Sequence, residues 1–305
     1  MRTGHLIASG ALAAALALTA CSAGGSTAGG SADDGRPSVV AAFYPLAYAA
    51  EQVGGSAVSV TSLTPPGVEP HDLELSAAQV ADIASADVVL YIRGFQPAID
   101  EAVDQQAPDR AIDVSERLAL IGMATADGNA SDTASDPHVW LDPANMAAIG
   151  DTIAASVIGL EPSTEPEVTA NAAAFSSAMT SLDSEFSDGL QSCASRDLVV
   201  SHEAFGYLAA AYGMTQVGIS GLSPEAEPSP ARMRDVADLV REQGITTIYY
   251  ETLVDPKVAQ TIADETGAST AVLDPLEGLQ SDATGDYVSI MRDNLATLRV
   301  GQGCT

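Results

Sequence analysis

Residues 164–192, TEPEVTANAAAFSSAMTSLDSEFSDGLQS, carry one uninterrupted helical pattern that divides the rest of the chain in two. No proline follows Pro166, which suits the first turn of a helix. Apolar side chains recur at spacings of three or four, at Val168, Ala172, Phe175, Met179, Leu182, Phe186 and Leu190. A helix of about 28 residues is about 42 Å long, which exceeds what one small lobe needs. We therefore predict a connecting helix over residues 164–193, with two helices broken near Ser184 as the alternative.

On both sides of this helix, short apolar runs alternate with helical patterns. The strands are expected at 39–43, 58–63 and 87–92 before it, and at 197–200, 245–250 and 270–273 after it. Such a strand–helix rhythm indicates parallel sheets covered by helices. The predicted fold class is α/β, with a first lobe (39–163) and a second lobe (194–305) of (β/α) type joined by one long rigid helix.

The N-terminus has the pattern of an export signal. A charged start precedes an apolar run from Leu6 to Ala20 that is too short to span a bilayer comfortably, so residues 1–20 are expected to be a signal peptide. Leu18-Thr19-Ala20-Cys21 resembles the bacterial lipobox, which implies cleavage before Cys21 and a lipid on its sulfur; a chance cysteine after an ordinary signal is the alternative. Residues 21–38, rich in Gly, Ser, Ala and Asp, read as a flexible tether. We expect an exported protein, held by its lipid on the bacterial cell membrane and facing the outside or the periplasm.

The cysteines indicate a disulfide, and the net charge excludes one class of partner. Cys193 and Cys304 form an even pair in an exported chain, which favours a disulfide over two free thiols. The formal net charge of −29 excludes nucleic acid as a partner by repulsion.

The chain has only four histidines. Three of them, His71, His138 and His202, lie in three separate loops next to predicted strands or helices. Residues 136–143, DPHVWLDP, place His138 and the only tryptophan between two Asp-Pro turns. His71 follows a proline-rich loop, and His202 follows the strand at 197–200. Because ligands of open α/β sheets bind beyond the carboxyl ends of strands, these loops predict a site in the cleft between the lobes.

The fourth ligand is expected from a carboxylate. Asp274 follows the strand at 270–273 and would complete a closed tetrahedral set that suits Zn²⁺. Imidazole also suits Cu, Ni and Fe, whereas Mn²⁺ and Ca²⁺ prefer more oxygen. The alternative that remains open is that Asp274 is only a turn residue and that Glu251 is the fourth ligand. Glu203 is expected either to accept an imidazole N–H or to be an ordinary carboxylate in a first helical turn.

Four motifs carry a family resemblance. PHDLELS (70–76), DPHVWLDP (136–143), SHEAFGY (201–207) and LDPL (273–276) are similar to the ligand motifs of the metal-binding lipoproteins that feed ABC-type zinc and manganese importers. EPSP (227–230) also occurs there, and the resemblance covers about residues 38–303. It implies two lobes joined by a rigid helix, and we expect a monomer that binds one Zn²⁺ per chain. It also implies delivery of that ion to an ABC permease in the cytoplasmic membrane.

The resemblance implies that His202 favours zinc, because the manganese binders of the family tend to carry glutamate there. One departure is the loop at 122–135, which is short and acidic where many zinc members are rich in histidine. We expect it to be a mobile surface loop, whose only possible metal-gathering groups are Asp127, Asp132 and Asp136. A manganese or iron carrier is the closest alternative function. A zinc hydrolase is more remote, since no H-E-x-x-H helix occurs, and an added role as a surface adhesin stays open.

Overall fold

The computed structural model describes residue 1, residues 35–124 and residues 130–305, with the side chains of 123–134 left out. The predicted signal peptide, the lipobox Cys21, most of the tether and the side chains of Asp127 and Asp132 lie outside this part. Residues 36–305 form a unit of their own. No helix in the described part is both long and apolar enough to cross a membrane.

Four parallel strands form the first sheet, in the order β2-β1-β3-β4. Val39 of β1 lies opposite Val60 of β2 and Val88 of β3, and both β1 and β3 are almost fully buried. This burial is the reason why their sequences are nearly continuous apolar runs. The elements of this lobe are β1 (Ser38–Ala41), α1 (Tyr44–Gly54), η1 (Gly55–Ala57), β2 (Ser59–Ser62), α2 (Ala77–Ser85), β3 (Val88–Tyr91), α3 (Pro97–Gln106) and β4 (Ala111–Asp113).

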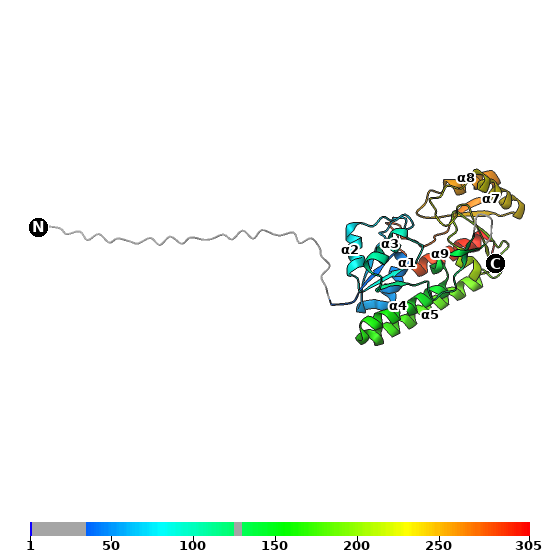
Figure 1. Ribbon diagram of the computed structural model, residues 1–305. Coiled ribbons are helices and arrows are strands. Elements are labelled where there is room, and N and C mark those ends of the chain that lie inside the picture. Colours follow the sequence, from blue (N-terminus) through cyan, green and yellow to red (C-terminus); the bar gives the residue numbers. More distant parts are fainter. Residues whose placement is uncertain (2–34, 125–129) are drawn as a thin grey trace. The chain divides into compact units, whose positions relative to one another are not determined.

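The second sheet is also parallel, with the order β10-β9-β7-β8. Helices α7 and α8 lie together beside this sheet (Figure 1). Its elements are β7 (Asp197–Val200), α6 (Gly206–Ala211), β8 (Thr215–Gly218), α7 (Pro230–Gln243), β9 (Thr247–Tyr250), α8 (Lys257–Thr266), β10 (Ser269–Val272) and α9 (Tyr287–Gly301). The predicted fold class, two parallel α/β lobes with a long helix, is confirmed; the lobe bounds at 163 and 194 stay predictions.

The long helix is α5 (Glu165–Gly189), which runs beside α4 (Pro143–Leu160) as the green pair in Figure 1. It is 25 residues long and unbroken, so the alternative of two helices is wrong. Its predicted apolar positions are buried, and it packs against α1 and α4 of the first lobe and α9 of the second. One hydrophobic core therefore continues from the first lobe through α5 into the second.

Local sequence signals placed several helix ends well. Ser76 and Gln79 form a capping box at the start of α2. Ser229 accepts a hydrogen bond from the Arg232 N–H, and Gly244 ends α7 in the left-handed conformation. Thr164 precedes α5 but does not cap it, because its hydroxyl donates to the Glu161 carbonyl instead, through the turn of η3 (Pro162–Thr164).

The segment 122–135 is not simply a loop. It contains two antiparallel strands, β5 (Gly122–Ala124) and β6 (Ala130–Ser135), that lead directly into Asp136. An antiparallel pair is held by main-chain hydrogen bonds, so it can form where the side chains give no apolar signal.

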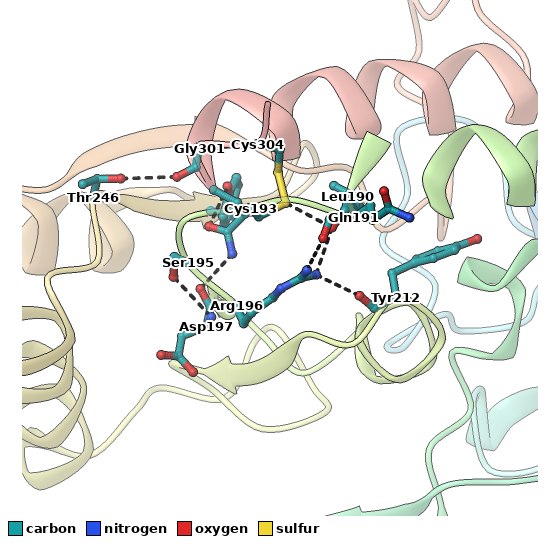
Figure 2. Close-up of a disulfide and its surroundings, with 12 residues drawn as sticks. Leu190, Gln191, Cys193, Ser195, Arg196, Asp197, Tyr212, Thr246, Gly301 and Cys304 are labelled. Atoms are coloured by element: carbon teal, nitrogen blue, oxygen red, sulfur yellow. Dashed lines mark hydrogen bonds between the residues drawn. A yellow bond between two sulfur atoms is a disulfide. The ribbon is translucent and has the colours of Figure 1, made fainter. Parts of the chain in front are cut away.

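Cys193 and Cys304 form the predicted disulfide (Figure 2). Beside it, the Arg196 guanidinium donates to the carbonyls of Leu190 at 2.9 Å and Gln191 at 2.7 Å. The last carbonyls of a helix have no partner within the helix, so Arg196 satisfies the end of α5. The disulfide thus joins the segment that follows α5 to the segment that follows α9.

Candidate metal centre

His71 lies on the loop that follows β2, and this loop contacts the second lobe. The Gly67 N–H donates to the Leu279 carbonyl at 2.7 Å, and the Ser281 hydroxyl donates to the Pro66 carbonyl at 3.4 Å. Gly67 has φ +84°, a conformation that favours glycine. The loops that carry His71 and residues 277–281 are therefore fastened to each other.

His138 is held by the two Asp-Pro turns that the sequence predicts. The Asp136 carboxylate accepts the His138 N–H at 2.9 Å, and the Asp142 carboxylate accepts the Ala144 N–H at 2.8 Å, which caps α4. Between them, η2 (Val139–Leu141) buries Trp140 completely.

Trp140 links the His138 loop to the second lobe. Its indole N–H donates to the Pro275 carbonyl at 2.7 Å, and its own carbonyl accepts the Tyr287 hydroxyl at 2.6 Å. Tyr207 of α6 makes a similar link, since its hydroxyl donates to the Asp136 carbonyl at 2.9 Å. The position of His138 is therefore fixed by both lobes.

In the second lobe, His202 follows β7 and Glu277 lies on the loop after β10, both beyond the carboxyl ends of parallel strands. Just before Glu277 stands Leu276, with φ +56°, the one positive φ outside glycine among the described residues. This left-handed residue turns the chain so that the Glu277 carboxylate points toward the three histidines.

The four side chains converge on one point. A ligand atom of each lies within 4.8 Å of the others, in the group His71, His138, His202 and Glu277. The Glu277 Oε1 atom is 3.4 Å from Nε2 of His71, 3.2 Å from Nε2 of His138 and 3.0 Å from Nε2 of His202. Ligand bonds of about 2.0–2.1 Å in a regular tetrahedron place neighbouring ligand atoms about 3.3 Å apart. The three distances from Glu277 therefore match the edges of a tetrahedral metal site.

Burial and charge agree with this geometry. His138 and His202 are 0% exposed and Glu277 is 3% exposed. Burial raises the pKa of the Glu277 carboxyl, but the His202 charge and hydrogen bonds from the imidazoles outweigh it and hold that pKa well below its usual range. Conversely, burial lowers the pKa of His202, but Glu277 and Glu251 outweigh it and raise the value to about 10. Without a metal ion, a proton on His202 supplies positive charge beside Glu277 and Glu251.

Two further carboxylates orient the imidazoles. Asp136 Oδ1 lies 2.7 Å from Nδ1 of His138, and Glu251 Oε1 lies 2.6 Å from Nδ1 of His202. The Ser201 hydroxyl in turn donates to Glu251. An Nδ1–H held by a carboxylate leaves Nε2 as the free electron pair, and such partners orient metal-binding histidines in general. Glu251 therefore lies behind His202 and is not the fourth corner of the cluster.

Asp274 is not the fourth corner either, contrary to the expectation from the sequence. Its carboxylate turns back on its own loop, where it accepts the Leu276 N–H at 2.8 Å and the Thr252 hydroxyl at 3.3 Å. Asn294 of α9 clamps the Asp274 main chain through two hydrogen bonds, of 2.9 and 2.7 Å. Asp274 is thus the turn residue that was the alternative, and it supports the loop that presents Glu277. Sequence reasoning missed Glu277; the only signal was its place three residues beyond Asp274, after the same strand.

Two roles were expected for Glu203, an acceptor for an imidazole N–H or an ordinary carboxylate in a first helical turn, and α6 begins only at Gly206. The hydrogen bonds and ion pairs of the described residues do not connect its carboxylate to a site histidine, and its N–H donates to the Gly221 carbonyl. Burial raises the pKa of Glu203, and Arg232 opposes this effect.

Comparison with known proteins places this site in a family. The family described as "Zinc-uptake complex component A periplasmic" matches residues 39–301. The chain belongs to this zinc-uptake component A family. The zinc-binding lipoprotein AdcA of Streptococcus pneumoniae (strain R6) is 34% identical over 279 residues, which are 87% of this chain and 56% of that protein. The chain therefore spans about half the length of that curated relative.

Two further comparisons cover nearly the whole length of the matched chain. The high-affinity zinc uptake system protein ZnuA of Bacillus subtilis (strain 168) is 31% identical over 304 residues, which are 94% of both chains. The crystal structure of the Zn(II)-bound ZnuA-like domain of Streptococcus pneumoniae AdcA has a TM-score of 0.75 at 33% identity, and covers 88% of this chain and 99% of that one. The family resemblance read from the four motifs is confirmed.

Proposed function

We propose that this protein is an extracytoplasmic zinc-binding protein that captures one Zn²⁺ per chain and delivers it to an ABC-type membrane importer. The observation that carries this proposal is the convergence of three Nε2 atoms on Glu277 Oε1 at 3.0–3.4 Å. In this proposal His71, His138, His202 and Glu277 are the four ligands. The ion is cargo, so these residues bind it for release rather than for chemistry.

The donor set supports zinc over the closest alternatives. Three borderline nitrogen donors and one oxygen suit Zn²⁺, whereas Mn²⁺ prefers six oxygen-rich positions. Iron(II) accepts imidazole but generally takes more ligands than four. A hydrolase is disfavoured because catalytic zinc keeps an open position for water, and four protein atoms here fill a tetrahedron.

The place of action follows from the relatives and the N-terminus together. Members of the family are described as a lipoprotein and as a periplasmic component of zinc uptake. We extend this to a chain anchored by lipid on Cys21, which meets its permease at the outer face of the cytoplasmic membrane. A lipidated monomer tethered there holds captured zinc close to the importer.

Zinc-limited growth tests the proposal. A strain that lacks the gene should grow poorly in chelator-treated medium and take up little ⁶⁵Zn²⁺. The wild-type gene should restore both, and a His138→Ala/His202→Ala variant exported to the same level should restore neither. Restoration of uptake by that variant would contradict the proposal, as would a deletion strain that needs manganese rather than zinc.

Anchoring has its own test. Cys21→Ser should release the protein from the membrane fraction into the soluble fraction while leaving the zinc affinity of the purified chain unchanged. Retention of this variant in the membrane fraction would contradict lipidation at Cys21.

A further inference from the structure

We propose that Phe95 is a selectivity residue of the metal site, because its ring keeps water in the neighbouring cavity away from the bound ion and so preserves four-coordination. This inference deepens the proposed function and rests on it. Phe95 is not one of the four proposed metal ligands, and its side chain contributes no donor atom.

Phe95 follows β3 on the loop that leads to α3, and it is 2% exposed. Its ring packs edge-to-face against two of the site imidazoles. The centroid of the Phe95 ring lies 4.6 Å from that of His71, at an interplanar angle of 70°. It lies 5.9 Å from that of His138, at 75°. One aromatic ring therefore covers the side of the cluster that these two histidines form.

The same ring faces a cavity of about 610 Å³. His71, Phe95, Pro137, Ser115 and Ser223 are among the residues that line it. Its lining is largely apolar but includes the charged side chains of Asp72, Arg93 and Asp113, and it opens to solvent, so a cavity of this size holds water. His71 is the member of the cluster that lines it, and 10% of its side chain is exposed, whereas His138 and His202 are fully buried. Phe95 thus stands between this water and the inner part of the site.

The ring cannot easily move aside. Phe43 lies behind it with ring centroids 4.6 Å apart, and Trp140 packs against it at 5.0 Å. Trp140 is itself fixed by its hydrogen bond to the Pro275 carbonyl. A side chain held this closely in a core leaves its rotamer only at a cost in packing.

Coordination number is what separates the two candidate metals. Zn²⁺ is satisfied by four ligands in a tetrahedron, whereas Mn²⁺ favours six, largely oxygen, and would need water to complete them. A side of the site that excludes a fifth or sixth ligand therefore lowers the affinity for Mn²⁺ much more than the affinity for Zn²⁺. Selectivity arises from what the site excludes as well as from its donors.

The test uses Phe95→Ala, the milder Phe95→Leu, and Phe186→Leu as a matched control. Phe186 is fully buried on α5, and its ring stacks on that of Tyr212. Each variant is checked for folding by circular dichroism and thermal unfolding, then loaded with Co²⁺, whose visible absorption reports coordination number. Zn²⁺ and Mn²⁺ affinities are measured by competition in the same preparations.

Wild type and Phe186→Leu should give the intense visible bands of four-coordinate Co²⁺. Phe95→Ala should give the weaker bands of five- or six-coordinate Co²⁺, with Phe95→Leu between them. The Zn²⁺-to-Mn²⁺ affinity ratio should fall about tenfold or more in Phe95→Ala, which corresponds to about 1.4 kcal/mol.

Unchanged bands and an unchanged affinity ratio in both Phe95 variants would overturn the inference and leave the proposed function intact. If Phe95→Ala does not fold, the Phe95→Leu result alone decides the inference, because this variant already lacks the aromatic ring that keeps water away from the ion. A wild-type chain that binds neither Zn²⁺ nor Co²⁺ would instead overturn the proposed function, and the inference with it.

Discussion

Nε2 of His202 and Oε1 of Glu277 lie 3.0 Å apart, although 75 residues separate them in the chain. Both belong to loops of the second lobe, and the same Oε1 atom faces His71 and His138 of the first lobe. Glu277 is thus the common contact of all three histidines. The site exists only when both lobes and the 274–277 turn are in place.

Asp136→Asn should weaken zinc binding by about 10–100-fold, as typical losses of such hydrogen-bond partners do. The carboxylate 2.7 Å from Nδ1 of His138 fixes the tautomer that leaves Nε2 free, and an amide lacks the charge that favours it. Competition with a chromophoric chelator measures the change.

Asp113→Asn is the control for this variant. Asp113 lines the cavity beside His71 and Phe95, but its carboxylate accepts from the Ser115 N–H and hydroxyl. Equal losses of affinity in Asp136→Asn and Asp113→Asn would mean that only the general negative field matters, and not the orientation of His138.

Zinc binding should release protons even at pH 8. Glu277 and Glu251 overcome the effect of burial and raise the pKa of His202 to about 10 in the metal-free protein, so this imidazole is still protonated at pH 8. Zn²⁺ must displace that proton, and therefore the affinity should keep rising with pH from 7 to 9. A histidine with the ordinary value of about 6.5 would release almost none at pH 8.

Calorimetric titrations in buffers of different ionisation enthalpy count the released protons directly. We expect about one proton per zinc at pH 8, as one imidazole gives up its proton. No release at pH 8, together with a flat affinity from pH 7 to 9, would contradict a protonated His202.

Much of the fold could be predicted from the sequence because the signals for its helices and strands are local. Ser229 before Pro230 and Gly244 after Gln243 marked both ends of α7, and apolar spacing marked α5, although that helix ends at Gly189 rather than near Ser192. The strands of 122–135 gave no such signal, since their pairing depends on main-chain hydrogen bonds. Short elements such as β4 and β8 likewise lack a distinctive pattern.

The histidines of the site could be predicted because each follows a distinct local motif in a chain with few histidines. The carboxylate could not be chosen by the same reasoning. Asp274 and Glu277 both follow β10, and their roles are decided by the left-handed Leu276 and by the clamp from Asn294. A positive φ at leucine is a product of tertiary packing, which residue types alone do not reveal.

Removing the disulfide should destabilise the protein without emptying the metal site. Cys193 and Cys304 are 111 residues apart, and the chain-entropy argument gives about 4–5 kcal/mol, within the usual range of about 2–5. Urea unfolding of Cys193→Ser/Cys304→Ser should show this loss, and reductant should reproduce it in wild type but not in the variant. A difference below about 1 kcal/mol would contradict a stabilising role, and a change in zinc stoichiometry would contradict its independence from the site.

The identity of the fourth ligand is the central claim, and one zinc titration of three proteins tests it most directly. Wild type, Glu277→Ala and Asp274→Ala are compared for stoichiometry and affinity by chelator competition at one pH. We predict one zinc per wild-type chain, a loss of at least about 100-fold in Glu277→Ala, and a smaller loss in Asp274→Ala, which weakens only the support of the loop. A larger loss in Asp274→Ala than in Glu277→Ala, or full wild-type affinity in Glu277→Ala, would contradict the account.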